Sequence, residues 1–180
     1  VEKSGAANER EFQQMVDFAK KRGLVVLEAI RIAFNPDLEL IRQSLGKLGK
    51  IRRAIFTCGA YSSRYDNFKR GIIENAFRPE MCNGALMDLG VYAVNIMVDL
   101  FGAPQKVNAD AIRLENGLDG VLTATCTYPG MLATVFTSKV ADSSGLSEIQ
   151  GEEGLMRIEN CSTPSSAAIT YNTRRSGQEK

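Results

Sequence analysis

The strongest constraint on the fold of this chain is a change in its hydrophobic pattern at Pro104. Before Pro104, apolar residues recur at helical spacing in three stretches, residues 8–22, 35–48 and 84–101. Two apolar runs between them, Leu24–Ala29 and Ile51–Tyr61, are predicted to form strands, the first of them buried. Beyond Pro104, turn residues separate six strand-like segments, which are 106–114, 120–128, 132–139, 147–152, 155–159 and 167–172.

This order of elements predicts an α+β fold, in which an open, mainly antiparallel β-sheet carries helices packed on one face. Pro129-Gly130 and Glu153-Gly154 are connections short enough for antiparallel hairpins. Residues 62–83 have no clean period and are expected to form a long irregular segment, which in a compact domain usually has a function. We expect one domain over residues 1–172, followed by a polar tail over 173–180 that frays.

The composition excludes several kinds of chemistry. The chain has no histidine, so Ser-His-Asp and Cys-His nucleophiles and imidazole-bound zinc are excluded. Proton transfer must then use Lys, Tyr, Cys, Asp or Glu. The cysteines at 58, 82, 126 and 161 include no C-x-x-C pair, which indicates separate, reduced, mostly buried thiols in a cytoplasmic protein and no metal site.

The charge and hydropathy patterns argue against two classes of partner. Lys and Arg number 22 and Asp and Glu number 21, and this balance is not typical of a nucleic-acid-binding protein. No stretch approaches about 18 uninterrupted apolar residues, so we expect no membrane span.

One candidate site lies in the sequence Gly84-Ala-Leu-Met-Asp88-Leu-Gly90-Val-Tyr92. Asp88 and Tyr92 are four residues apart and share one face of a helix. The neighbours of Asp88 are apolar, which predicts a partly buried carboxylate, and such a group is costly unless it has partners. An Asp that only caps the helix beside a core Tyr is an equally simple interpretation.

Two further segments hold candidate residues. Lys3 follows a β-like start of the chain, and its simplest interpretation is a solvated terminal lysine. Glu28 and Arg31 lie at the exit of the predicted strand 24–29, where sites gather in α/β units. The alternative for Glu28 and Arg31 is a surface ion pair, which stabilises little.

In this order and spacing, the segments resemble the C-terminal part of the glucose–fructose oxidoreductase / inositol dehydrogenase / MocA family. Glu2-Lys3 matches the start of the family's Glu-Lys-Pro motif, with Ser4 in place of Pro. The stretches Glu28-Ala-x-Arg31-x-x-Phe34-x-Pro36 and Gly84-Ala-Leu-x-Asp88-x-Gly90-x-Tyr92 follow in register. The resemblance extends to about Glu153. Ser4 does not fix the backbone angle φ as Pro does, so the geometry after Lys3 is left open.

The resemblance implies a role for each matching residue. Lys3 would approach the substrate hydroxyl and the nicotinamide, Asp88 would orient the substrate or assist the proton relay, and Tyr92 occupies the family's acid/base position, which is often His. Substrate-binding roles are implied for Arg31, Arg78 and Asn83, and cofactor contacts for Glu2 and Lys3.

The resemblance also implies an enzyme that uses NAD or NADP and acts on the CH–OH group of a sugar, polyol or related compound. No Gly-x-Gly-x-x-Gly sequence follows a strand in this chain, so we expect the nucleotide to bind mainly to an N-terminal Rossmann domain outside it. Residues 1–172 would form the substrate-binding and oligomerisation domain, inactive alone and assembled through its sheet as a homodimer or tetramer. The alternative is a non-catalytic assembly or sugar-sensing domain.

Overall fold

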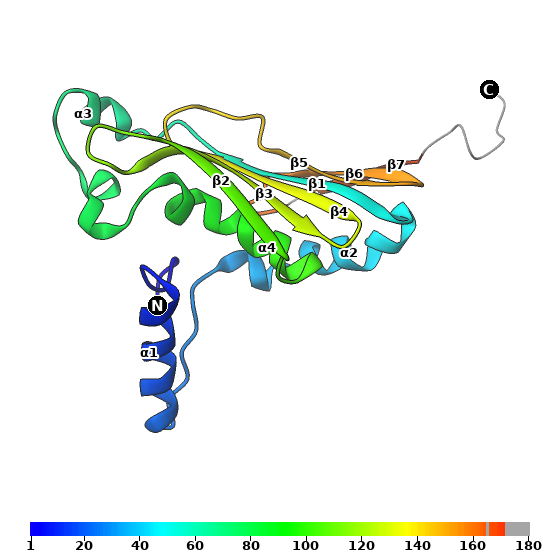
Figure 1. Ribbon diagram of the computed structural model, residues 1–180, viewed down its shortest axis with the longest axis horizontal. Coiled ribbons are helices and arrows are strands. Elements are labelled where there is room, and N and C mark those ends of the chain that lie inside the picture. Colours follow the sequence, from blue (N-terminus) through cyan, green and yellow to red (C-terminus); the bar gives the residue numbers. More distant parts are fainter. Residues whose placement is uncertain (165, 172–180) are drawn as a thin grey trace.

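The computed structural model describes residues 1–164 and 166–171, and its main feature is one seven-stranded sheet with helices along one face (Figure 1). In space the strands follow the order β2-β3-β4-β1-β5-β6-β7. Neighbouring strands are antiparallel, except that β1 and β4 pair in parallel at the centre. The strands are β1 (Ile51–Gly59), β2 (Lys106–Arg113), β3 (Asp119–Tyr128), β4 (Met131–Ser138), β5 (Leu146–Gly151), β6 (Gly154–Glu159) and β7 (Ser166–Tyr171). The predicted α+β fold with an open, mainly antiparallel sheet is confirmed.

The predicted hairpins are also confirmed. Tyr128 pairs with Met131 across the turn at Pro129-Gly130, and Gln150 pairs with Leu155 across the turn at Glu153-Gly154. The last predicted strand, 167–172, corresponds to β7 as far as Tyr171. Residue 172 and the predicted tail 173–180 lie outside the described residues.

The three stretches with helical spacing all form helices, and side chains cap two of them. Asn8 Oδ1 accepts from the backbone N–H of Glu11 (3.1 Å), and Asn35 Oδ1 accepts from the backbone N–H of Asp37 (2.8 Å). The helical elements are α1 (Glu9–Lys21), η1 (Arg31–Phe34), α2 (Pro36–Ser44), η2 (Leu45–Leu48), α3 (Tyr65–Lys69), η3 (Asn75–Phe77), η4 (Pro79–Met81), the π-type η5 (Leu86–Gly90) and α4 (Val91–Phe101).

The core lies between the sheet and the helices beneath it. Ile96 and Met97 of α4 are buried in one cluster with Phe56 of β1 and Val135 of β4. Each such side chain stabilises the fold by about 1.5–3 kcal/mol relative to an exposed one. The stretch Pro79–Phe101 has the length and apolar composition of a membrane span, with a mean hydropathy of 1.5. Its buried side chains, however, pack into the domain's own core.

One predicted strand is wrong. Residues Leu24–Ala29 are extended but belong to no strand, and Leu24, Val25 and Leu27 are 59%, 84% and 65% exposed. Two backbone hydrogen bonds pair this run with Val1, whose amino group donates to Leu27 O (2.8 Å) and whose carbonyl accepts from Ala29 N (2.7 Å). An apolar run becomes a buried strand only where another strand and a covering layer meet it, and the described residues supply neither.

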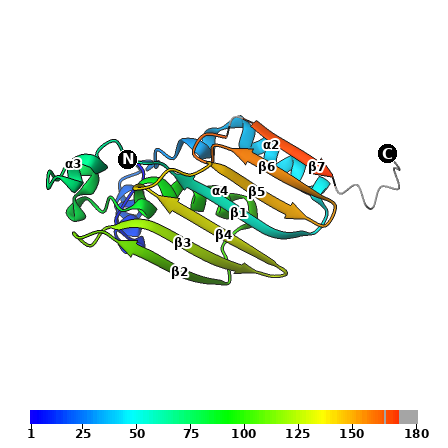
Figure 2. The same ribbon diagram turned by 90° about the horizontal axis from the view of Figure 1, so that it is seen from above.

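The N-terminal segment is set apart from the sheet. Figure 1 shows α1 standing away from the sheet and the other helices. Figure 2 shows the sheet from the face that the helices do not cover, with α4 and α2 behind it. Of the residues of α1, only Ala19 is buried. The amphipathic pattern of α1 therefore predicted the helix correctly, but its apolar face is only half covered.

Candidate active site

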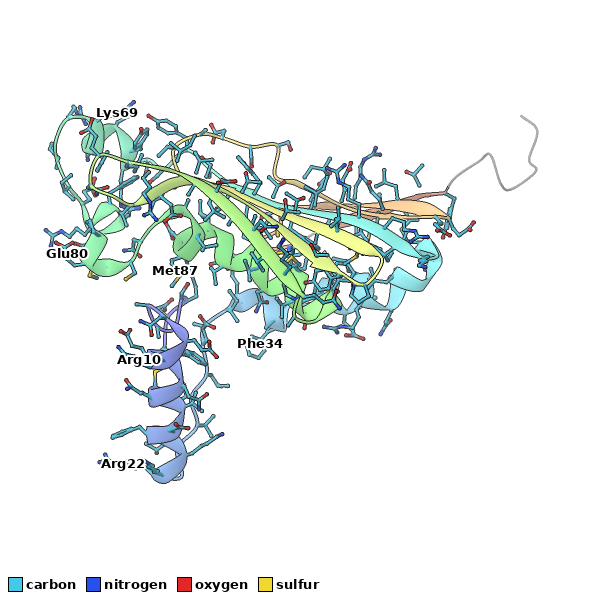
Figure 3. All side chains as sticks on the ribbon, in the orientation of Figure 1. Arg10, Arg22, Phe34, Lys69, Glu80 and Met87 are labelled. Atoms are coloured by element: carbon cyan, nitrogen blue, oxygen red, sulfur yellow. The ribbon has the colours of Figure 1, made fainter. Side chains whose placement is uncertain are left out.

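The start of the chain meets η5 at a junction that joins segments distant in the sequence. Lys3 Nζ donates to Asp88 Oδ1 (2.9 Å) and also to the backbone carbonyl of Asp88. Ser4 Oγ donates to the carbonyl of Met87 (2.9 Å), and the Lys3–Ser4 peptide bond is cis. Figure 3 labels Met87 at this junction, between the N-terminal end of α1 and the sheet layer. Lys3 is thus not the solvated terminal lysine of the simplest interpretation, because its side chain is only 18% exposed.

The glycines of the 84–92 motif let this segment lie close to the sheet. A Cβ at Gly84 would lie 1.7 Å from Asp119 Oδ1, and Asp119 Oδ2 accepts from the backbone N–H of Leu86 (2.7 Å) at the start of η5. A Cβ at Gly90 would lie 3.0 Å from Thr137, whose hydroxyl donates to the carbonyl of Ala85 (3.1 Å). The small residues and the two partners from β3 and β4 therefore fix where Asp88 points.

Tyr92 lies beside two cations. Lys3 Nζ is 5.3 Å from the centroid of the Tyr92 ring, and Arg31 Cζ is 5.6 Å from it, both within the range of a cation–π contact. The structure therefore brings Lys3, Asp88, Tyr92 and Arg31 together, as the family resemblance implies.

The predicted alternative for Glu28, an ion pair with Arg31, is absent from the ion pairs of the part of the chain that the structure describes. Glu28 Oε1 accepts instead from the backbone N–H of Gly5 (2.7 Å), which holds the N-terminal segment against residues 24–30. Phe34 of the same motif points away from the site and is 73% exposed (Figure 3).

Lys139 is a site residue that the sequence analysis missed. It follows the last residue of β4 and is fully buried. Its Nζ donates to Asp88 Oδ2 (3.3 Å), Ala76 O (2.6 Å) and Asn83 O (2.5 Å). In the sequence it is only the last residue of a predicted strand, and nothing local signals its burial.

Two lysines keep Asp88 ionised. Burial raises the pKa of the Asp88 carboxyl, but the hydrogen bond from Lys3 and the charge of Lys139 outweigh burial, so the pKa lies below its ordinary value. The nearby Cys58 thiol is the opposite case, because burial raises its pKa to about 11 against the pull of Lys3. Cys58 is therefore a neutral thiol at physiological pH.

Two cavities adjoin the Lys3–Asp88 pair, and Asn83 lines both. The larger is about 630 Å³ and is lined by Arg64, Ile73, Glu74, Asn75, Ala76, Arg78, Asn83 and Asp88. The smaller is about 320 Å³ and is lined by Glu2, Lys3, Ser4, Ala6, Ala7, Glu80, Met81, Cys82, Asn83 and Met87. The predicted substrate residues Arg78 and Asn83 thus line the larger cavity, and the predicted cofactor residues Glu2 and Lys3 line the smaller. Arg31 and Tyr92 line neither cavity. The Tyr92 ring contacts Lys3, and Arg31 contacts that ring from its own position on η1.

Residues 62–83, which are predicted to be irregular, form the three short helices α3, η3 and η4 with loops between them. They supply most of the larger cavity's lining. The four cysteines are scattered: Cys58, Cys126 and Cys161 are buried, Cys82 is exposed, and all four are free thiols.

Comparisons with known proteins agree with one another. The family model described as the GFO/IDH/MocA C-terminal domain matches residues 40–157. The chain is 40% identical over 174 residues to scyllo-inositol 2-dehydrogenase (NADP(+)) IolU of Bacillus subtilis, covering 97% of this chain and 53% of that protein. It is 30% identical over 176 residues to the human trans-1,2-dihydrobenzene-1,2-diol dehydrogenase, covering 93% and 50%.

Solved structures show the same fold. An NAD binding oxidoreductase from Klebsiella pneumoniae matches with a TM-score of 0.80 and 19% identity, over 98% of this chain and 51% of that one. The aldose-aldose oxidoreductase from Caulobacter crescentus matches with a TM-score of 0.74 and 20% identity, over 95% and 52%. The chain spans about half the length of each of these relatives.

Proposed function

This chain belongs to the GFO/IDH/MocA family, and from that premise we propose that it is the substrate-binding domain of an NAD(P)-dependent oxidoreductase acting on a CH–OH group of a sugar, polyol or related compound. The observation that carries the proposal is the meeting of Lys3, Asp88 and Tyr92 beside a polar cavity. The names of the relatives support it, because one is a scyllo-inositol dehydrogenase and another an aldose-aldose oxidoreductase. The non-catalytic alternative is not favoured, because these relatives are dehydrogenases and oxidoreductases.

The site residues suit oxidation of an alcohol or reduction of a carbonyl. The substrate oxygen loses or gains a proton in this reaction, and the chain has no histidine to exchange it. We assign the exchange to the Tyr92 hydroxyl and assign to Lys3 a hydrogen bond that stabilises charge on the same oxygen. Asp88 holds the Lys3 ammonium in place through Oδ1.

The larger cavity suits a polyhydroxylated substrate. Its lining combines guanidinium, carboxylate and amide groups, which donate to and accept from hydroxyl groups. We assign substrate contacts to Arg78 and Asn83 there, and a third contact to Arg31 beside Tyr92.

We assign the smaller cavity to the nicotinamide end of the nucleotide. Glu2, Lys3 and Ser4 offer a carboxylate, an ammonium and a hydroxyl, which suit a polar carboxamide. Either NAD or NADP, when bound, supplies the hydride acceptor or donor. We propose that the rest of the nucleotide is held by a part of the longer protein outside this chain, and that this chain alone does not catalyse the reaction.

The uncovered sheet face and the free cysteines bear on the assembly and the location of the protein. The sheet face opposite α2 and α4 would form a homodimer or tetramer contact, because an open sheet face is commonly covered by a second sheet. The free cysteines fit a cytoplasmic protein.

The test is to incubate the purified full-length protein with inositols, aldoses and other polyols, and with NAD⁺ or NADP⁺, while following reduced nucleotide. We expect saturable turnover of at least one polyol. Absence of turnover across the panel with both nucleotides, and with the matching ketones and NADH or NADPH, would contradict the proposal.

A further inference from the structure

The most unusual group outside the predicted site is the buried ammonium of Lys139. We infer that Lys139 is a positioning residue of this enzyme, which fixes the Asp88 carboxylate and the cavity segment 76–83 relative to each other. The inference rests on the proposed function, since Asp88, Arg78 and Asn83 matter only if the cavity binds substrate. Lys139 lines neither cavity, so its action passes through the groups that it binds.

Every donor of the Lys139 ammonium has an acceptor. Lysine has three N–H groups, and here they meet Asp88 Oδ2, Ala76 O and Asn83 O. The ring of Phe77 lies 4.5 Å from the same nitrogen. A lysine is almost never fully buried unless it is paired, so this arrangement is a built site and not an incidental surface contact.

The backbone of Lys139 is fixed as firmly as its side chain. Its N–H donates to Gly120 O (3.0 Å), and its carbonyl accepts from Ser62 N (3.0 Å). The ammonium is therefore held at the end of the sheet, which makes it a suitable anchor for the cavity segment 76–83.

The first consequence concerns Asp88. Its Oδ1 accepts from Lys3 and its Oδ2 from Lys139, so each oxygen has one cation and the carboxylate cannot rotate without losing a partner. Lys3 is the lysine assigned to the substrate oxygen. Lys139 therefore sets the position of Lys3 indirectly, by holding the carboxylate that binds it.

The second consequence concerns the cavity wall. Ala76 and Asn83, whose carbonyls Lys139 binds, bracket a segment that contains η4 and Arg78. Asn83 Nδ2 also donates to Asn75 O (3.0 Å), which closes the segment on itself. The assigned substrate contacts of Arg78 and Asn83 thus depend on the same ammonium as Asp88.

The charges around Lys139 predict a pH effect. Lys3 from the N-terminal segment, Asp88 from η5 and Asp119 from β3 act on Lys139, and Cys58 of β1 is influenced by Asp88 and Lys3. Lys139 lowers the pKa of Asp88, so its removal raises that pKa. The loss of activity on acidification then begins at a higher pH.

The test compares Lys139→Met with Lys139→Arg in the full-length protein, using a polyol that the wild type oxidises. Met keeps the length and removes the charge and donors, whereas Arg keeps the charge. For Lys139→Met we expect kcat/KM to fall roughly 10- to 100-fold, with kcat lowered and KM raised, because small misplacements at a site have effects of this size. We also expect the acidic limb of the kcat/KM profile to move to higher pH. Lys139→Arg should recover part of the rate and the wild-type limb, and Lys47→Met, at an exposed lysine, should change neither.

The outcomes separate the two proposals. A wild type that oxidises no polyol overturns the proposed function. An active wild type whose Lys139→Met variant keeps the wild-type kcat, KM and pH limb overturns the inference, and so does a rate loss with an unshifted limb, which would indicate a structural role only. If Lys139→Met does not fold, Lys139→Gln, which retains donors for the carbonyls but not the charge, takes its place with the same readouts and the same expected shift.

Discussion

Lys3 and Asp88 are 85 positions apart in the sequence, and their side chains form an ion pair with 2.9 Å between Nζ and Oδ1. This pair lies between the two cavities of the site and brings the N-terminal segment to the one motif that contains both Asp88 and Tyr92. The ion pair is the centre of the proposed chemistry, and four predictions follow from its surroundings.

Removing the Lys3 ammonium should impair catalysis more than folding. We expect Lys3→Ala in the full-length protein to lower kcat about 100-fold or more, because it loses a charged hydrogen bond to the substrate oxygen. Steady-state kinetics measure the effect. The matched control is Lys47→Ala, at an exposed lysine of η2, which should keep the wild-type rate. Equal rates for Lys3→Ala and wild type would remove Lys3 from the mechanism.

Tyr92→Phe should separate the catalytic contribution of the hydroxyl from the packing contribution of the ring. The ring remains to contact Lys3 and Arg31, so the melting temperature should stay close to that of the wild type. The proton-exchanging group is lost, and kcat should fall about 100-fold or more. Tyr171→Phe, at an exposed tyrosine of β7, is the control and should be silent in both assays. A fully active Tyr92→Phe enzyme would show that another group exchanges the proton.

Asp88 should stabilise the fold in a pH-dependent way. Its pKa in the folded protein lies below its ordinary value of 3.8, so its stabilisation is present above that value and is lost as the pH falls through the folded pKa. Asp88→Asn leaves two lysines without their shared carboxylate and should lower the free energy of unfolding at pH 7 by about 1–3 kcal/mol. Thermal melts from pH 7 to pH 3 should show the difference between the variants shrinking at the acidic end. A difference that grows on acidification would contradict the assigned direction of the pKa shift.

Gly84 should tolerate no side chain. Its Cβ would meet Asp119 Oδ1 at 1.7 Å, and moving Asp119 breaks the bond to Leu86 N that starts η5. Gly84→Ala should destabilise the domain by about 1–3 kcal/mol, as overpacked positions do. Gly46→Ala is a clean control, because no atom lies within 4 Å of its added Cβ. The check is the midpoint of chemical denaturation of each variant. Equal midpoints for Gly84→Ala and Gly46→Ala would show that the η5 junction adapts to a side chain.

Much of the fold could be predicted from local patterns. Helical spacing and cap residues identified α1, α2 and α4, because these depend on neighbours within a few positions. Turn residues located the two hairpins for the same reason. The run at 24–29 was predicted wrongly because a strand needs a partner, and no local pattern in Val25 or Leu27 shows whether one exists.

Some residues of the candidate site could be predicted from the sequence, and one could not. Helical spacing relates Asp88 to Tyr92, and the family resemblance adds Lys3; the structure places Lys3 in contact with both. Lys139 could not be found, since its acceptors lie 51 to 63 positions away, on η3, at Asn83 and on η5. Its burial follows from tertiary packing, which leaves no local trace in the sequence.

The most direct test of the central claim is to follow the transferred hydrogen itself. A polyol that is oxidised by the full-length protein would be deuterated at its reacting carbon, and mass spectrometry would locate the label after turnover. We expect deuterium in the reduced nicotinamide formed by the wild type, and transfer slowed about 100-fold or more in Lys3→Ala. Turnover that leaves the nicotinamide unlabelled, or transfer that is equally fast without the Lys3 ammonium, would contradict the account.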